Sequence, residues 1–425
     1  MTAADAWPSA PPRINRKQLA AVCMGNGLDF YDFVTFAFFA TQIGRTLFPD
    51  NGGNGLLYAL LTFGAGFLTR PLGGIAFGRI ADRRGRVPAM LMSFSLMGVS
   101  IVGLALTPAY ATIGMAAPVL AVTFRLLQGF ALGGEVGPNA AFLYEAAPRG
   151  RRALYVAMLG VTQNLAVVAS GAVGAILSAW LMPAELDAYG WRIAFLIGAA
   201  IVPVAAWIRR TLVEPTMPDA PEASLLPRRS RSLVIGGFLT LAAGNVAFLS
   251  IEYLGTYAQT VLNLPAENAF HSILVLGLVA AATDLVAARL MDRGIPAWWL
   301  VLPWAVLLVF IIPSFMILTD LRTPGALLAI TAFLGIVLEL TFIPMLVVFI
   351  GALPRTARAT LVGGAYALAI AIFGGSAQPI INRLLAWTGN PISPAWYMTL
   401  AAAVGLVGIV MLIRNAPRPL RGLTA

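Results

Sequence analysis

Two acidic residues lie inside the first long apolar run of the sequence, where an acid is costly. The run extends over about residues 19–39 and contains Asp29 and Asp32. A helix of roughly 20 apolar residues crosses a bilayer. An acid at its centre costs on the order of 2.5–3.5 kcal/mol, and residues three apart share a helix face. That face must point at a bundle interior or a cavity. Both acids, Asp32 above all, are therefore candidates for proton coupling; the alternative is that they cap a turn or pair with a buried arginine.

A buried arginine is predicted at a similar depth. Arg125 lies about twelve residues inside its own apolar run, which corresponds to roughly 18 Å of helix. A buried arginine needs a partner. It can pair with Asp32 or Asp29 and so take part in coupling, or bind an anionic substrate, because the guanidinium fork matches a carboxylate. A purely structural pairing is the third possibility.

Other polar residues inside apolar runs are candidates for a substrate cavity, because such groups usually face the bundle interior, although many only hold helices together. Besides Arg125, the uncharged candidates are Asn26, Tyr31, Gln163, Asn164, Tyr253, Tyr257, Gln378 and Asn382. Three acids, Glu252, Asp284 and Glu339, are further candidates in the second half. They either hold protons, because burial disfavours a charged acid, or bind an ammonium or guanidinium group.

A glycine-rich stretch that ends in a charged loop, from Gly73 to Arg86, indicates a moving contact between helices. Glycines let helices approach closely. The acid and arginines that follow can latch helix ends by ion pairs that break on opening. Asp82-Arg83 recurs as Asp292-Arg293 in the second half. The predicted gating residues are Asp82, Arg83, Arg86, Glu135, Glu145, Arg149, Arg152, Asp292, Arg293, Arg355 and Arg358.

Composition indicates a polytopic membrane protein. Of 425 residues, 59% are hydrophobic and 11% are charged, whereas soluble domains have about 25% charged residues. A single cysteine, Cys23, and a single histidine, His271, predict neither a disulfide nor a metal site. We find no nucleophile or metal constellation, so no enzyme activity, catalytic residue or cofactor is predicted.

The apolar runs predict an all-α protein with about twelve membrane-spanning helices, because the runs have helical length and lack strand alternation. Most of the 28 basic residues fall in the loops of one side. The positive-inside rule makes that side cytoplasmic and places both termini there. The basic excess is therefore a topology signal. We expect a lipid bilayer and a small molecule as partners, no nucleic acid, and a monomer.

The chain divides at its longest polar connection. We predict a cytoplasmic tail over residues 1–18, a six-helix bundle over 19–210, a linker over 211–232, a second bundle over 233–414 and a tail over 415–425. The halves are weakly repeated, since Pro148-Arg149 also recurs as Pro354-Arg355. Tandem halves of this kind place a binding site at the midplane between them.

These motifs resemble those of the major facilitator superfamily. Gly25-Asn26 with Asp29 to Phe33, and Arg125 to Glu135, are similar to signatures of its metabolite–proton symporter family, and bacterial citrate–proton symporters are the nearest likeness. The resemblance implies two pseudo-symmetric six-helix bundles in the bacterial inner membrane. It also implies proton-coupled import of a small polar metabolite such as a di- or tricarboxylate. Sodium in place of the proton is an alternative, because the two clustered acids Asp29 and Asp32 could serve either ion.

The sequence also departs from citrate carriers. Glu252, Asp284 and Glu339 stand where uncharged residues are expected, and Asp29 stands where glutamate is usual. Acids repel a trianion, so a zwitterionic or amine-bearing substrate such as a betaine or amino acid is an alternative. A proton-driven exporter of the same superfamily is another.

Overall fold

The computed structural model describes residues 16–49, 55–148, 150–211, 228–264, 266–354 and 357–416. All regular secondary structure in these residues is helical. Most of the predicted tails and linker lie outside the described residues, as do the gating candidates Arg149 and Arg355. The predicted domain boundaries therefore stay predictions.

The first bundle comprises α1 to α10. Its helices are α1 (Arg16–Phe38), α2 (Ala40–Leu47), α3 (Gly55–Arg84), α4 (Arg86–Leu106), α5 (Tyr110–Ile113), α6 (Ala116–Ala146), α7 (Arg152–Trp180), α8 (Pro183–Glu185), a π-helical turn (Leu186–Gly190), α9 (Trp191–Gly198) and α10 (Ile201–Thr211).

The second bundle comprises α11 to α18. Its helices are α11 (Arg228–Glu252), α12 (Leu254–Thr260), α13 (Ala266–Asp292), a 3₁₀ turn (Ala297–Leu300), α14 (Leu302–Leu321), α15 (Pro324–Ala352), α16 (Arg358–Ala369), a π-helical segment (Ile370–Gly374), α17 (Gly375–Thr388) and α18 (Ser393–Asn415).

The helices have the length and composition of membrane spans. Ten segments of the described chain are long and apolar enough to cross a bilayer. The helices α1 and α3, with 23 and 30 residues, are long enough for two more, which is consistent with the twelve predicted. Large apolar side chains such as Leu68 and Val99 are exposed on the outside of the bundle, as expected for surfaces that face lipid.

Glycines bring α3 and α6 into backbone contact. A Cβ atom on Gly129 would lie 1.8 Å from the carbonyl oxygen of Gly66, and one on Gly73 would lie 1.8 Å from that of Phe130. Only glycine fits at either position. The predicted role of the glycine-rich stretch as a close helix contact is confirmed for Gly73.

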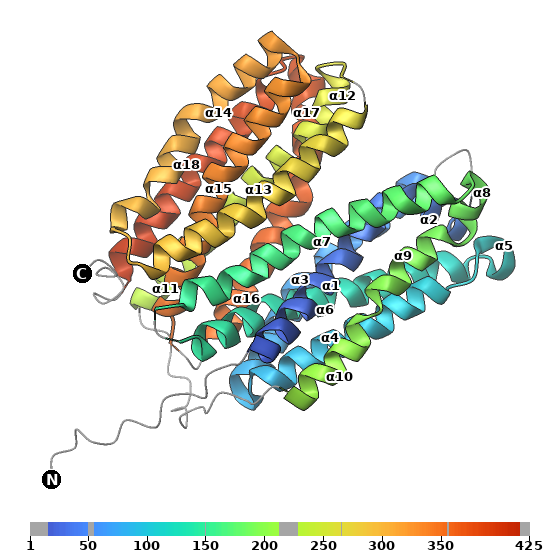
Figure 1. Ribbon diagram of the computed structural model, residues 1–425, viewed down its shortest axis with the longest axis horizontal. Helices are drawn as coiled ribbons and strands as arrows, with labels where there is room; N and C mark the ends of the chain where they lie inside the picture. The colour runs from blue at the N-terminus through green and yellow to red at the C-terminus, as the bar shows by residue number, and fades with distance from the viewer. Residues whose placement is uncertain are drawn as a thin grey trace.

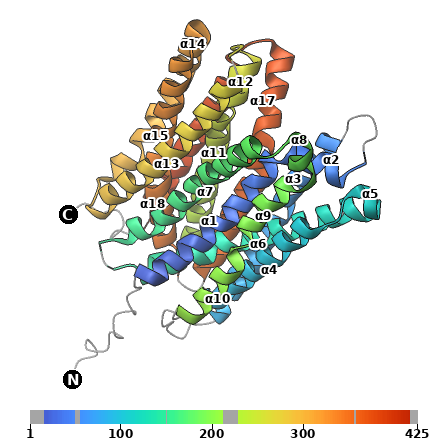
Figure 2. The ribbon, with the colours of Figure 1, turned by 45° about the vertical axis from the view of Figure 1, so that its right-hand side comes forward.

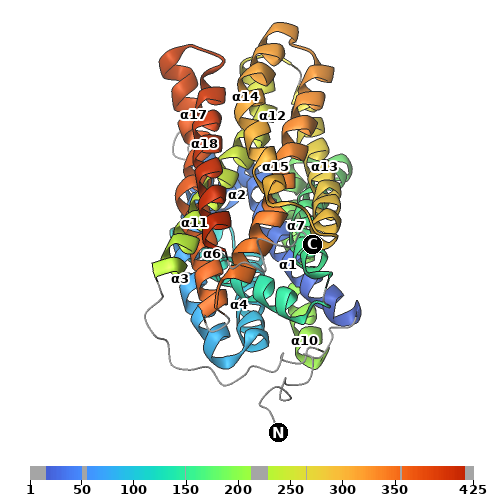
Figure 3. The same ribbon diagram turned by 90° about the vertical axis from the view of Figure 1, so that its left-hand side faces the viewer.

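The two bundles converge at one end of the molecule. We call it the basic end; Asp82, Glu145, Asp292 and Arg358 lie there. The ribbons of the bundles come together at this end and diverge toward the other, where α2 lies apart from α12 and α14 (Figures 1 and 2). The view from the side shows α16 crossing low between the bundles, next to α6 (Figure 3). The bundles contact each other mainly through α7 with α13 and through α16 with α3 and α6, and α15 adds smaller contacts with α6 and α7.

Candidate functional site

The two acids of α1 are fully buried, as is Arg125 on α6. The expected ion pair is absent: within the described residues, Arg125 bonds to neither acid. It donates instead to Oε1 of Gln128 at 2.9 Å and to the carbonyl oxygen of Phe33 at 3.3 Å. Gln128 follows one helical turn later and Phe33 is adjacent to Asp32, so acceptors nearer to the guanidinium replace the carboxylate. Arg125 still acts electrostatically on Asp32.

A second buried arginine lies beside Arg125. The guanidinium carbon of Arg70 lies 4.1 Å from the ring centre of Phe33, and that of Arg125 lies 4.2 Å from the same ring. Aromatic faces attract cations, so this ring holds two like charges close together. Nε and Nη2 of Arg70 and Nε of Arg125 are buried and meet no acceptor among the described residues. Unfilled buried donors of this kind are suited to an anion.

Asp29 is paired with another acid. Its carboxyl group lies within hydrogen-bonding reach of that of Glu135 on α6. Asn139 donates to one oxygen of Glu135 at 2.7 Å, whereas the other oxygen and both oxygens of Asp29 meet no donor in the described chain. Two desolvated carboxylates in contact repel each other, so this pair is suited to sharing a proton. Glu135, predicted as a gating residue, lies beside Asp29 and not among the ion pairs of the basic end.

Three of the predicted cavity residues hold helices together in this conformation. Asn26 donates to the carbonyl oxygen of Leu159 at 2.9 Å and accepts from Gln163 at 3.1 Å, which ties α1 to α7. The hydroxyl of Tyr31 donates to the carbonyl oxygen of Ala194 at 3.1 Å, which ties α1 to α9. Sequence alone could not distinguish these contacts from substrate contacts.

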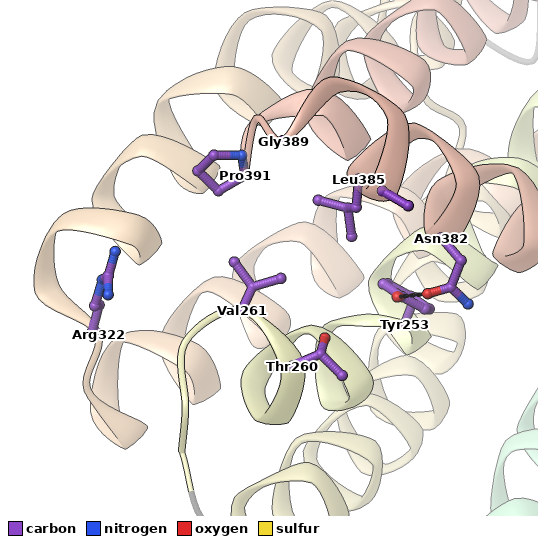
Figure 4. A pocket seen from close by; sticks show the side chains of 9 residues that line it. Tyr253, Thr260, Val261, Arg322, Asn382, Leu385, Gly389 and Pro391 are labelled. Carbon is purple, nitrogen blue, oxygen red and sulfur yellow. Dashed lines mark hydrogen bonds between the residues drawn. The ribbon is translucent and has the colours of Figure 1, made fainter.

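A cavity of about 500 Å³ lies in the second bundle, at the end away from the basic end. Tyr253 donates across it to Asn382, and Thr260 and Arg322 line it (Figure 4). Tyr257 is buried beneath the rim, where its hydroxyl donates to the carbonyl oxygen of Pro391 at 2.8 Å. The cavity therefore contains two of the predicted residues, Tyr253 and Asn382.

The remaining candidates of the second bundle lie apart from this cavity. Glu252 ends α11 and is half-buried, as is Gln378 on α17. Asp284 is fully buried and Glu339 is 6% exposed. Their carboxyl groups lie within hydrogen-bonding reach of each other, and Asn164 of the first bundle donates to Asp284 at 3.2 Å.

At the basic end, Asp82 caps a helix of the opposite bundle. It accepts from the backbone N–H of Thr360 at 2.9 Å and of Ala359 at 3.3 Å, in the first turn of α16, and from the Thr360 hydroxyl. An anion there is favoured by the helix dipole. Arg86 forms an ion pair with Asp82. The arginines around Asp82 that the sequence suggests are thus only part of its environment.

Asp292 makes the equivalent contact with the first bundle. It accepts from the backbone N–H groups of Ala153 and Leu154, both at 2.9 Å, in the first turn of α7. Glu145 lies between two arginines, with Arg358 at 2.9 Å and Arg86 at 3.5 Å. Only the first of these ion pairs crosses from one bundle to the other.

The other gating candidates are more peripheral. Arg152 packs over the ring of Tyr144, with its guanidinium carbon 4.9 Å from the ring centre. Arg83 and Arg293 are exposed.

Sequence reasoning missed Thr360 as the partner of Asp82, because nothing in the local sequence marks a residue 278 positions away as a contact. It also missed Gly160, where a Cβ atom would lie 2.5 Å from Oδ2 of Asp284.

In the described part of the chain, no group of three or more histidine, cysteine, aspartate or glutamate side chains could hold a metal ion. The buried charged groups of the described chain are arginines and acids, and four of the acids lie in two pairs. This arrangement can bind an anion and store protons.

Comparisons with known proteins agree with this architecture. Residues 19–379 match the family described as Major Facilitator Superfamily. The citrate–proton symporter of Salmonella typhi is 32% identical, over 93% of this chain and 94% of its own. The alpha-ketoglutarate permease of Escherichia coli K12 is 31% identical, over 98% of each chain.

Two further matches are more distant. The proline/betaine transporter of Escherichia coli K12 is 26% identical, over 96% of this chain and 85% of its own. Among solved structures, the proton:xylose symporter XylE superposes with a TM-score of 0.77 at 14% identity, over 94% of this chain and 95% of its own. At that identity the likeness concerns the fold alone.

Proposed function

The chain belongs to the Major Facilitator Superfamily, and we propose that it is a proton-coupled symporter that imports a di- or tricarboxylate such as citrate. It does so by alternating access, in which the two bundles rock about a midplane site. The observation that carries this proposal is the arginine pair on Phe33. Its unfilled N–H groups offer an anion several charge-assisted hydrogen bonds.

The relatives support a carboxylate as the substrate. Two of those reported above are named for citrate and for alpha-ketoglutarate, which are both small carboxylates, and each matches nearly the whole chain. In our proposal, Arg125 and Arg70 bind carboxylate oxygens. Tyr253 and Asn382 reach the substrate from the second bundle, on the wall that lines the cavity of Figure 4.

Asp32 is the coupling acid in this proposal. It is fully buried, one residue from Phe33, and no donor in the described chain reaches its two oxygens. A proton on Asp32 removes its repulsion toward an incoming carboxylate and leaves the arginines free to bind it. Proton and substrate then cross together, because each favours the occupancy of the other.

We propose that the basic end faces the cytoplasm, in a bacterial inner membrane and with both termini inside. The support is the positive-inside distribution of arginines. In this orientation, the conformation described here is closed toward the cytoplasm by the contacts of Asp82, Asp292 and Arg358. We further propose that the protein transports as a monomer.

The direct test is uptake by purified protein in proteoliposomes. Labelled citrate should accumulate when the outside is acidic, and addition of a protonophore should release it. Replacing external sodium by choline should leave uptake unchanged. Absence of citrate and alpha-ketoglutarate uptake under a proton gradient would refute the proposal. Gradient-driven efflux of these compounds would favour the exporter.

A zwitterionic substrate is the second candidate, favoured by Glu252 on the second bundle. This acid is half-buried and forms no ion pair within the described residues. With Arg125 in the first bundle, it would give the two walls opposite charges. A betaine or amino acid complements both walls, and one relative is a proline/betaine transporter.

A further inference from the structure

Asp284 is a buried acid whose surroundings do not fit a substrate-binding role. It projects from α13 toward α7 and is fully buried in the contact between the two bundles. A ligand in a cavity between the bundles could not touch it without first separating α7 from α13. Burial of a carboxyl group at this position costs free energy, which its neighbours or a bound proton must compensate.

Among the described residues, Asn164, Gly160 and Glu339 lie against the carboxyl group of Asp284, and none of the three is basic. Nδ2 of Asn164 donates to Oδ2 at 3.2 Å. Gly160, one turn earlier on α7, has no side chain, and a Cβ atom there would lie 2.5 Å from the same oxygen. The third neighbour is the carboxyl group of Glu339 on α15. Oδ1 of Asp284 meets no donor among the described residues.

Few titratable groups face Asp284 and Glu339 from the adjacent helices. The helices α7, α15, α12 and α11 pack on α13. Among the described residues of these helices, Glu339 is the only titratable side chain that interacts with Asp284, and α7 contributes the amide of Asn164. Tyr366 on α16 interacts electrostatically with Glu339. In the described chain no arginine or lysine forms an ion pair with either acid.

Two ionised carboxylates cannot lie in contact in such a desolvated position, because each repels the other and water does not screen them. One proton between them removes the repulsion and supplies a donor to an oxygen that otherwise has none. A metal cation fits less well than a proton. The Asn164 side chain presents an N–H donor to Asp284, whereas a hard cation needs oxygen ligands.

We propose that Asp284 and Glu339 form a second proton-binding site, separate from the acids of α1, which holds one proton while α7 packs on α13. Glu339 retains 6% exposure whereas Asp284 has none, so the proton enters through Glu339. Separation of α7 from α13 removes the Asn164 amide and admits water to Asp284. The proton is then released, which ties its movement to the rocking of the bundles.

The first test measures bound protons and needs no substrate. Infrared difference spectra of the purified protein between acidic and alkaline medium report protonated carboxyl groups. Glu339→Gln and, separately, Asp284→Asn should each remove one carboxyl signal. Asp320→Asn, at an exposed acid of the same bundle, serves as the control and should leave the buried carboxyl signals intact. Unchanged signals in both Glu339→Gln and Asp284→Asn would overturn the proposal.

A third variant acts without removing either acid. Gly160→Ala should displace the Asp284 carboxyl group and shift its infrared signal, whereas Gly171→Ala on the same helix should not, because a Cβ atom there has only an ordinary contact at 3.9 Å. If the signals of the two glycine variants are the same, Asp284 does not titrate in contact with α7, and the proposal fails.

The second test counts protons in transport and rests on the proposed function. In proteoliposomes, the limiting accumulation of citrate should depend on the pH gradient less steeply in the double variant Asp284→Asn with Glu339→Gln. One proton fewer per cycle lowers the limit about tenfold for each pH unit. An equal limit in wild type and double variant would overturn a role in coupling. If wild type accumulates no citrate, the proposed function fails while the infrared result still decides the site.

Discussion

Asp82 and Asp292 each accept hydrogen bonds from the first turn of a helix in the opposite bundle, Asp82 from α16 and Asp292 from α7. The arrangement is reciprocal, since each bundle has one acid that caps a helix of the other bundle and one helix that is capped by the other bundle's acid. The first four N–H groups of a helix have no partner within the helix, so a neighbouring acid stabilises both the helix end and the contact between bundles. Rocking the bundles apart must break both caps.

Replacement of Asp82 by asparagine should slow transport more than it weakens substrate binding. Asparagine still accepts a hydrogen bond but loses the charge that favours a helix N-terminus by about 0.3–1 kcal/mol. The conformation closed at the basic end should become about two- to fivefold less favoured. Citrate uptake rate and citrate affinity should be measured together. Asp187→Asn is the control, because Asp187 pairs with Arg45 within the first bundle. Normal turnover in Asp82→Asn would refute the role of Asp82 in holding the basic end closed.

Asp32→Asn should abolish accumulation of citrate against a gradient while exchange of citrate across the membrane continues. The variant keeps the shape of the side chain but cannot gain or lose a proton. Uptake driven by a pH gradient and exchange at equal pH should be compared in the same proteoliposomes, with Asp320→Asn as control. Should Asp32→Asn still concentrate citrate with normal proton dependence, the coupling acid lies elsewhere, with Glu252 and the two acid pairs as candidates.

Removing either arginine beside Phe33 should weaken citrate binding. Hydrogen bonds to charged groups contribute about 1.5–3 kcal/mol, so Arg125→Gln and Arg70→Gln should each raise the Kd of citrate by about 10- to 150-fold. Calorimetric titration of the purified protein measures this directly. The control is Arg45→Gln, whose side chain is 62% exposed. Equal Kd values in Arg70→Gln and wild type would exclude Arg70 from the site.

Glu252→Gln distinguishes the two candidate substrates. If citrate is the substrate, loss of this negative charge should leave citrate binding unchanged or strengthen it, because the acid can only repel an anion. If the substrate carries an ammonium group, the same change should abolish binding of a betaine or amino acid. Titrations of citrate and of proline betaine into both proteins answer the question. Tight binding of the betaine by wild type and none by the variant would contradict the carboxylate assignment.

Gly129→Ala should destabilise the folded protein. The added methyl group would lie 1.8 Å from the backbone oxygen of Gly66, so α3 and α6 must move apart. Overpacking of this kind costs about 1–3 kcal/mol, and the thermal unfolding midpoint should fall. Gly64→Ala on α3 is the matched control, because a Cβ atom there has no neighbour within 4 Å. Equal unfolding midpoints for the two variants would show that the helix contact tolerates a methyl group.

Local patterns predicted the helices and several of their roles. The apolar runs, the glycines of α3 and the acid at its end are all visible within a few residues of sequence, because helix length and small residues decide these features. The same stretch predicted Asp82 as a latch of helix ends, but it did not reveal the helix of the opposite bundle that Asp82 caps.

Partners distant in sequence could not be predicted. Asn164 and Asp284 are 120 positions apart, and only tertiary packing brings them together. Arg125 illustrates the other difficulty, since its acceptors are Gln128, on the same helix face, and a backbone carbonyl group. No periodicity of side chains reveals a carbonyl group as a partner, so the sequence suggested a carboxylate.

The contact between Asn164 and Asp284 also has a mechanical consequence. Along α13, Asp284 lies eight residues from Asp292 and eighteen from Ala266, or about 12 Å and 27 Å of helix. A rigid helix that tilts away from α7 at its Asp292 end therefore loses its contacts in a fixed order. The cap of α7 by Asp292 is lost first, the Asn164 amide about 12 Å further along is lost second, and the end at Ala266 moves least. Release of the proton from the buried acid pair then follows the opening of the basic end.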